Sequence, residues 1–259
     1  MRILVCVKSV PEAEANFRIN REGNFYDEAE LAFKVNEYDL CAVEEAVRIK
    51  EQCGDGRITI VSVGPARVDE QIKKAMALGA GYGVRIDDSA QPARDALSLA
   101  SLIAAWARPQ EFDLILCGVM SEDLQRGQVG PMLAQLLGRP CATTVVKIEL
   151  EAGQKSAVVE RELEGGLRER VRLPLPAVLT IQSGINIPRY ASLSNMLRVK
   201  KLEIPAVPAE TLAPGARKSE NILRTSLHKQ GAGCEFLEGR PEQVAEKLVA
   251  QIRSRLHIL

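Results

Sequence analysis

Short runs of apolar, β-branched residues alternate with amphipathic segments from the amino terminus to Leu137. The runs are apolar throughout, which is typical of strands buried on both faces of a sheet. The segments between them carry apolar residues at helical spacing and predict helices. The pattern therefore predicts a doubly wound α/β fold, in which helices cover both faces of a mainly parallel, Rossmann-like sheet. The predicted strands are Arg2–Val7, Ile58–Val63, Val84–Ile86 and Leu114–Cys117, and the predicted helices are Glu37–Gln52, Val68–Leu78, Pro92–Ala107 and Val129–Leu137.

The pattern changes after Thr143. Strand-like segments now follow one another without intervening helices and are separated by short turns, two of which contain glycine. This arrangement predicts a meander that adds an antiparallel extension to the sheet. The segments are Val145–Leu150, Ala157–Glu162, Leu167–Leu173 and Ala177–Ile181.

The rest of the chain has a different character. An irregular loop is expected over residues 182–198, and the proline-rich stretch 205–218 is expected to be extended, like a linker. An amphipathic helix is predicted to begin near Pro241 and to end near Leu256. We therefore expect two parts, an α/β domain over residues 1–203 and a C-terminal arm over residues 204–259. The apolar stripe of the last helix consists of Val244, Leu248 and Ile252.

Charge and hydropathy exclude several classes of protein. Lys plus Arg number 34 and Asp plus Glu number 34, so the formal net charge is zero. A general nucleic-acid binder has a basic excess, so we expect no nucleic-acid partner. No stretch approaches the ~18 apolar residues that a membrane helix needs, so we expect no insertion into a membrane. The apolar run at the amino terminus is too short for a secretory leader.

The cysteines are scattered and form no C-x-x-C pair, which speaks against a metal site or an iron–sulfur cluster. Several lie in apolar runs, where a thiol behaves as a small apolar group. We therefore expect no metal, and reduced thiols in a cytoplasmic protein. The cysteines are Cys6, Cys41, Cys53, Cys117, Cys141 and Cys234.

The segment Gly118–Pro131 links a predicted strand to a predicted helix. Gly127 and Gly130 allow close approach of a ligand to the main chain, and the helix start behind them offers free N–H groups to a phosphate. The alternative is a plain strand–helix turn with glycines for packing. Ligands of such sheets bind beyond the carboxyl ends of the strands, so the loops after Val7, Val63 and Cys117 are expected to share one pocket.

Two further segments have a functional and a structural interpretation. Asn36 and Asp39 fit an N-cap and an acidic first turn, and the exposed main chain there can also serve a nucleotide. Leu193 stands among small polar residues in a segment with a basic rim, which is typical of a protein-binding anchor. The alternative is that Leu193 covers the core. The rim consists of Arg189, Arg198, Lys200 and Lys201.

Catalysis by the chain itself has little support. The two histidines are His228 and His257, and there is no G-x-S-x-G or H-E-x-x-H motif. The Walker motif and G-x-G-x-x-G are also absent, which argues against phosphoryl transfer from a bound triphosphate. A nucleotide-hydrolysing or adenylating enzyme on the same sheet topology should show a Ser-Gly-Gly phosphate loop or a catalytic Lys near the first strand. Lys8 is the only candidate, and no such loop follows it.

Several blocks together resemble the beta subunit of electron transfer flavoproteins. They are VKSVPE, NEYDLCAVEEAVRIKE, VSVGPA, ALGAGYG, DLILCG running into GQVGPMLAQLLG, and PAVLTIQSGINIPRYASLSNMLRVKK. The resemblance covers roughly residues 1–203, and the pair AVEEAVRIKE and PRYASLSNMLRVKK is highly specific. It implies an adenine-nucleotide-binding, Rossmann-like domain that stores no electrons itself. It also implies an alpha subunit that holds a redox FAD and is wrapped by the C-terminal arm.

The resemblance further implies a nucleotide in this chain, either AMP or, in electron-bifurcating members, a second FAD that accepts hydride from NADH. Its phosphate is expected on the main-chain N–H groups near Gly127, Gln128 and Val129. Val129 has no hydroxyl to offer, and Arg126 is an unusual cation that either pairs with a phosphate or points to solvent. The expected nucleotide residues are Cys6, Asn36, Glu37, Tyr38, Asp39, Val63, Gly118, Asp123, Arg126, Gly127, Gln128 and Val129.

The resemblance also implies a docking loop. Leu193 matches a leucine that plugs into an apolar pocket of an acyl-CoA dehydrogenase, with Arg189, Tyr190 and Met196 as further docking residues. A membrane quinone oxidoreductase is a possible electron acceptor. The remaining alternative is a stand-alone nucleotide-binding module.

Overall fold

The computed structural model describes residues 1–259 except residues 13, 90–94, 213–219, 221, 228–232 and 257–259. Within the described residues, one sheet has nine strands in the order β11-β5-β4-β1-β6-β10-β7-β8-β9. All neighbours from β11 to β7 are parallel, and only the β7–β8 and β8–β9 pairs are antiparallel. The strands are β1 (Arg2–Cys6), β4 (Arg57–Val63), β5 (Tyr82–Asp87), β6 (Leu114–Gly118), β7 (Cys141–Leu150), β8 (Ser156–Glu162), β9 (Arg168–Pro174), β10 (Ala177–Ile181) and β11 (Ala206–Pro208).

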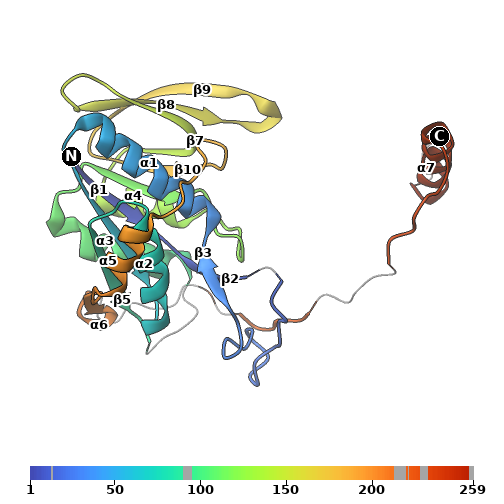
Figure 1. Ribbon diagram of the computed structural model, residues 1–259, viewed down its shortest axis with the longest axis horizontal. Helices are drawn as coiled ribbons and strands as arrows, with labels where there is room; N and C mark the ends of the chain where they lie inside the picture. Colours follow the sequence, from blue (N-terminus) through green and yellow to red (C-terminus); the bar gives the residue numbers. More distant parts are fainter. Residues whose placement is uncertain (13, 90–94, 213–219, 221, 228–232, 257–259) are drawn as a thin grey trace.

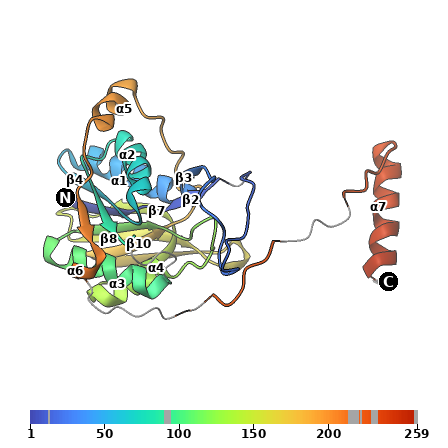
Figure 2. The same ribbon diagram turned by 90° about the horizontal axis from the view of Figure 1, so that it is seen from below.

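Helices cover both faces of this sheet, which confirms the doubly wound α/β prediction (Figure 2). Along β1, Ile3 and Val5 pack in the core under α1 and α2, whereas Leu4 and Cys6 pack under α3 and α4. Successive side chains of a strand point to opposite faces, so a strand buried on both must be apolar at every position. The helices are α1 (Glu37–Cys53), α2 (Asp69–Ala77), α3 (Ala96–Ala107), α4 (Val129–Leu137), α5 (Leu193–Lys200), α6 (Ala209–Leu212) and α7 (Pro241–Leu256).

The predicted meander is right for three strands and wrong for the fourth. β7, β8 and β9 are antiparallel, but β10 returns to the main sheet and lies parallel between β6 and β7. All five residues of β10 are buried and its centre is apolar, which is the pattern of an inner parallel strand. A small hairpin of β2 (Ser9–Pro11) and β3 (Phe33–Val35) was not predicted.

Three other boundaries differ from the predictions. The expected irregular loop ends in α5, because the Ser192 hydroxyl caps the helix by accepting a hydrogen bond from Asn195 N. The predicted third helix begins at Ala96, where Asp95 is the N-cap, and residues 92–94 lie outside the described residues. The expected extended stretch begins with the edge strand β11 and then the short helix α6, and its residues 213–218 lie outside the described part.

Helix α7 stands apart from the body of the sheet and helices (Figure 1). Among the described residues after α6, Glu220 pairs with Arg126 of the body, and Thr225 donates its main-chain N–H to Gly23 O and its hydroxyl to Asn24 O. The apolar residues Leu248, Val249 and Ile252 of α7 are exposed. A search of the described helices finds none whose length and apolar character would let it cross a bilayer.

Candidate functional site

A pocket of about 830 Å³, counted with its open mouth, lies at the carboxyl ends of β1, β4 and β6. This is the switch point of the sheet, because the chain adds β4 on one side of β1 and later adds β6 on the other. Nine of the residues predicted from the sequence line this single pocket: Cys6, Asn36, Asp39, Val63, Gly118, Arg126, Gly127, Gln128 and Val129.

The buried carboxylate of Asp39 joins the first turn of α1 to two strand ends. It accepts hydrogen bonds from Lys8 N at 2.7 Å, after β1, and from Gly118 N at 2.9 Å, at the end of β6. Burial raises the pKa of Asp39 to about 7, although these N–H donors act in the opposite direction. A Cβ atom on Gly118 would collide with the Asp39 carboxylate and would lie 2.7 Å from Tyr38 Cβ. Only glycine therefore permits this close approach.

Asn36 is the N-cap residue of α1, as predicted, but its side chain accepts no capping hydrogen bond from the helix. Its amide instead holds the loop after β6, because Nδ2 donates to Met120 O at 2.9 Å and Oδ1 accepts from Glu122 N at 3.0 Å. The carboxylate of Glu122 in turn accepts a hydrogen bond from Glu37 N at 3.1 Å. The loop after β6 and the start of α1 are thus joined by reciprocal hydrogen bonds, which a local sequence pattern cannot reveal.

The three other predicted nucleotide residues lie beside the pocket and do not line it. Asp123 binds Lys8, whose Nζ lies 2.7 Å from both carboxylate oxygens and 3.2 Å from Ser121 Oγ. Burial opposes ionisation of Asp123, but the Lys8 cation lowers its pKa, and the pair fixes the middle of the loop. Glu37 pairs with Lys34 at 2.9 Å, and Tyr38 packs by its Cβ against the main chain at Gly118.

Helix α4 supplies the polar end of the pocket. Gly127, just before it, has φ +62, a left-handed conformation that favours glycine. A Cβ atom on Gly130 would collide with Thr180 Cγ2, so the missing side chain lets the first turn of α4 pack on β10. The first N–H groups of a helix have no acceptor within it and carry partial positive charge. The donors therefore suit an anion, which is the character expected of a nucleotide phosphate.

Arg126 lies at the mouth of the pocket and forms an ion pair with Glu220 of the arm. An apolar part of the pocket lining comes from Leu99 and Ile103 of α3, with Leu124 from the loop. Sequence reasoning missed this apolar part, because helical spacing marks an apolar face without showing whether it meets a core or a pocket. It also missed Lys8 as a pocket residue, although its position directly after the first strand was a usable signal.

The thiols of Cys6 and Cys117 are part of the pocket lining. Cys6 and Cys117 are direct partners on the neighbouring strands β1 and β6. A hydrogen bond to Cys6, together with burial, raises the pKa of Cys117 well above its ordinary value. A thiol with a raised pKa stays protonated and is a poor nucleophile, so Cys6 and Cys117 give the pocket a small apolar surface.

Comparisons with known proteins agree with this geometry. A family model described as the electron transfer flavoprotein domain matches residues 24–212. The electron transfer flavoprotein subunit beta of Bos taurus is 37% identical over 255 residues, which cover 98% of this chain and 97% of that protein. The proteins of the same description from Methylophilus methylotrophus and Bacillus subtilis are each 34% identical, over 96% and 100% of this chain and over 97% and 100% of those proteins. The chain belongs to the electron transfer flavoprotein beta-subunit family.

The predicted docking residues of this electron transfer flavoprotein chain lie around the start of α5. Leu193 is the first residue of the helix and is 68% exposed, so the alternative that it covers the core is wrong. Tyr190 is 99% exposed, and Met196 is also exposed. Arg189 differs from these residues, because its guanidinium is bound to carboxylates of α1.

Proposed function

We propose that the chain is the beta subunit of a heterodimeric electron transfer flavoprotein, whose alpha subunit holds the redox FAD. In this role it is an electron-carrier subunit and not an enzyme. Electrons enter from an acyl-CoA or related dehydrogenase and leave to an acceptor such as a membrane quinone oxidoreductase. The FAD, when bound in the heterodimer, supplies the electron-accepting chemistry. The residues of this chain supply a rigid platform, a structural nucleotide site and a docking surface.

The observation that carries the proposal is the pocket at the switch point. In it, the helix N–H donors near Gln128 and Val129 face the same space as the apolar wall of Leu99 and Ile103. This combination fits an adenine nucleotide, because the donors suit the phosphate and the wall suits the base. The donors are main-chain groups, so the absence of a hydroxyl at Val129 does not remove them. AMP is the nucleotide that we propose, and Lys8 and Asp39 hold the surrounding loops in place.

The arm supports the proposed partnership. Helix α7 has exposed apolar residues along one stripe, which is the anatomy of a helix that is completed by another chain. We propose that the part of residues 204–259 that follows α6 forms the arm that packs on the alpha subunit, because β11 and α6 belong to the body. All six cysteines are free, which supports a reducing cytoplasmic location for the heterodimer.

An alternative is the electron-bifurcating form, in which the pocket holds a second FAD that accepts hydride from NADH. The open mouth of the pocket favours keeping this alternative, because a dinucleotide is longer than AMP and extends beyond the space that AMP fills.

The test is the nucleotide content of the heterodimer. The chain is purified with its alpha subunit, the complex is denatured, and the released nucleotides are identified by chromatography and mass spectrometry. One FAD with one AMP is the expected result, and two FAD per heterodimer selects the bifurcating form. A single FAD with no second nucleotide overturns the proposed site.

A further inference from the structure

The loop that leads into α5 is fastened to α1 at two points. The first point is Asn186, a buried residue whose Nδ2 donates to Cys41 O and to Glu45 Oε2, both at 3.0 Å. Glu45 is itself buried, and burial raises its pKa. A buried side chain with two directed hydrogen bonds has little freedom, so this end of the loop is fixed relative to α1.

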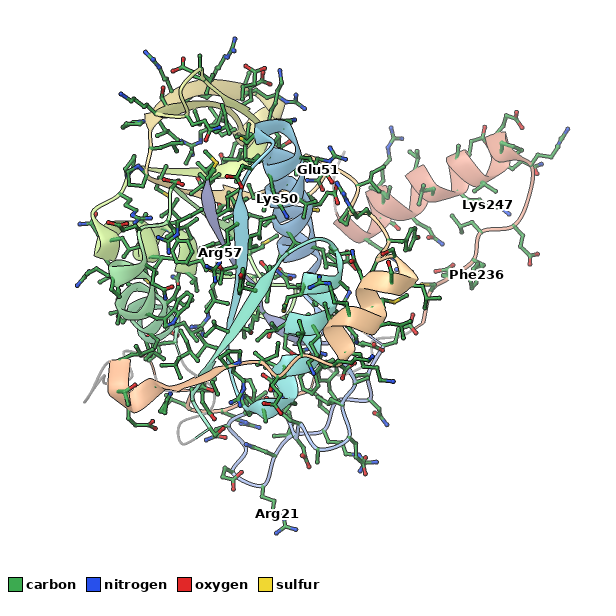
Figure 3. The ribbon with its side chains drawn as sticks, turned by 60° about the vertical axis from the view of Figure 1, so that its left-hand side comes forward. Arg21, Lys50, Glu51, Arg57, Phe236 and Lys247 are labelled. Carbon is green, nitrogen blue, oxygen red and sulfur yellow. The ribbon has the colours of Figure 1, made fainter. Side chains whose placement is uncertain are left out.

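The second point is Arg189, which binds the carboxylates of two residues of α1, Glu44 and Glu51. Its Nε and Nη2 donate to Glu44 at 2.8 and 3.1 Å, and its main-chain N–H donates to the same carboxylate at 3.2 Å. Its Nη1 and Nη2 donate to Glu51 at 2.6 and 3.0 Å. Figure 3 shows Glu51 near the end of α1, on the side that the chain leading to α5 passes.

These bonds occupy the guanidinium. Hydrogen bonds to Glu51 and then to Glu44 raise the pKa of Arg189, so the cation is held firmly between the two acids. The side chain of Glu44 is only 3% exposed, whereas that of Glu51 is 57% exposed. Planar, bidentate pairing of this kind fixes orientation as well as distance. Arg189 therefore has little capacity left to pair with a partner protein.

The tethered loop turns apolar side chains outward. Ile187 lies between the two points and is 85% exposed, and Tyr190 and Leu193 follow the second point and are also exposed. Apolar side chains held ready in a fixed arrangement lose little conformational entropy on binding, which favours affinity. Within the described part of the chain, the nearby cations Arg198, Lys200 and Lys201 form no ion pair with a carboxylate. The surface is thus apolar with a basic border.

We propose that Arg189, clamped by Glu44 and Glu51, is the positioning residue that holds Ile187, Tyr190 and Leu193 as one prearranged docking surface. The occupant is a redox partner protein with an apolar recess and an acidic rim, which complements the basic border. This inference rests on the proposed function as an electron transfer flavoprotein subunit. It also gives the reason why AVEEAVRIKE and PRYASLSNMLRVKK occur together, since Glu44 and Glu51 lie in the first block and Arg189 in the second.

The test uses the complete heterodimer with its FAD and an acyl-CoA dehydrogenase that reduces the unmodified protein. Arg189→Gln is expected to raise the KM for the heterodimer about tenfold, with kcat, flavin content and reduction by dithionite unchanged. Glu51→Gln, at a more exposed position, is expected to raise KM about threefold without affecting folding. Ile187→Ala is expected to raise KM by a similar factor.

The matched control is Arg48→Gln. Arg48 Nε also pairs with Glu44, at 2.9 Å, but it lies on α1 itself, and among the described residues no hydrogen bond or ion pair joins it to residues 183–192. Its KM is expected to stay within twofold of the unmodified value. Amide hydrogen exchange gives a second readout, because Arg189→Gln should speed exchange over residues 183–192 and leave α1 unchanged.

The outcomes separate the two claims. If Leu193→Ala raises KM but Arg189→Gln and Glu51→Gln do not, the positioning role is wrong and the docking surface stands. A Leu193→Ala heterodimer that accepts electrons with unchanged KM contradicts the docking function itself. Equal effects of Arg48→Gln and Arg189→Gln would show that only the charge on Glu44 matters, which also contradicts the clamp.

Discussion

The two ends of α1 serve two different sites with the same type of side chain. At its start, Asp39 binds the main chain at Lys8 and Gly118 and shapes the pocket. Further along, Glu44 and Glu51 bind the guanidinium of Arg189 and hold the loop that leads into α5. One helix therefore fixes both the proposed nucleotide site and the proposed partner surface relative to the sheet.

The pKa values of these carboxylates shift in different directions, because their hydrogen-bond donors differ in charge. Asp39 is bound by neutral N–H groups, so burial dominates and its pKa is raised to about 7. Glu44 is also desolvated, but cationic donors lower its pKa, and Arg189 lowers that of Glu51. A raised carboxyl pKa favours the folded state at low pH, and a lowered one favours it at higher pH. The pocket end and the loop end of α1 should therefore respond to pH in opposite directions.

The largest expected effect is at the pocket end. Gly118→Ala should destabilise the protein by about 3 kcal/mol or more, because the new methyl group must displace the Asp39 carboxylate or the Tyr38 side chain. Nucleotide content should fall with it. The control is Gly81→Ala, where an added Cβ meets open space and the expected change is within about 0.5 kcal/mol. Urea unfolding of both variants checks this, and equal stabilities would contradict the close approach.

The pH profile of Asp39→Asn sharpens the comparison. In the unfolded chain the carboxyl has its ordinary pKa of 3.8, and in the folded protein its pKa is about 7. Its contribution to stability therefore falls as pH rises from about 4 to about 7, because the folded state keeps the proton in that window. Asn cannot ionise, so the unmodified protein should lose stability relative to Asp39→Asn between about pH 4 and pH 7, with no further change above that window. Thermal unfolding over this range measures the difference, and parallel profiles would refute the raised pKa.

The loop end should show a smaller, opposite response. Glu44→Gln should lower the free energy of unfolding by about 1–2 kcal/mol, because Arg189 and Arg48 then lose the nearly buried carboxylate that they share. Glu51→Gln should cost less than about 0.5 kcal/mol, since exposed pairs are screened by water. The stabilisation by Glu44 is present above its unfolded pKa and is lost as pH falls through the lower folded value. Unfolding at pH 7 and pH 4 tests this, and a Glu44→Gln effect that grew at pH 4 would contradict it.

The sequence predicted what depends on local periodicity. Continuous apolar runs such as Ile3–Val5 identified the parallel strands, and the strand ends identified the loops that form the pocket. It failed where a distant residue decides the outcome. Asn36 is the N-cap residue by position, as predicted, but its side-chain amide bonds to Met120 O and Glu122 N instead of capping the helix. The sequence allowed Arg126 either to pair with a phosphate or to point to solvent, and in the structure Arg126 pairs with Glu220 of the arm.

The loop that leads into α5 also depends on a long-range contact that local sequence patterns do not predict. The exposed leucine and its basic surroundings could be recognised locally, but the clamp joins residues that are far apart in the chain. Glu44 and Arg189 are separated by 145 positions, so no pattern within a helical turn relates them. The position of β10 also depends on a return to the main sheet that turn patterns do not encode.

The most direct test of the central claim, that main-chain amides beside Gly127 hold a nucleotide phosphate, compares two glycines that flank α4. Gly127 and Gly138 have φ +62 and +65, so substitution by Val strains the main chain to a similar extent at both. Of these two glycines, Gly127 lines the pocket and Gly138 does not. Nucleotide per heterodimer is then measured after denaturation, normalised to the alpha-subunit FAD. The account predicts clear loss of the second nucleotide in Gly127→Val and full retention in Gly138→Val, whereas full retention in both variants would contradict it.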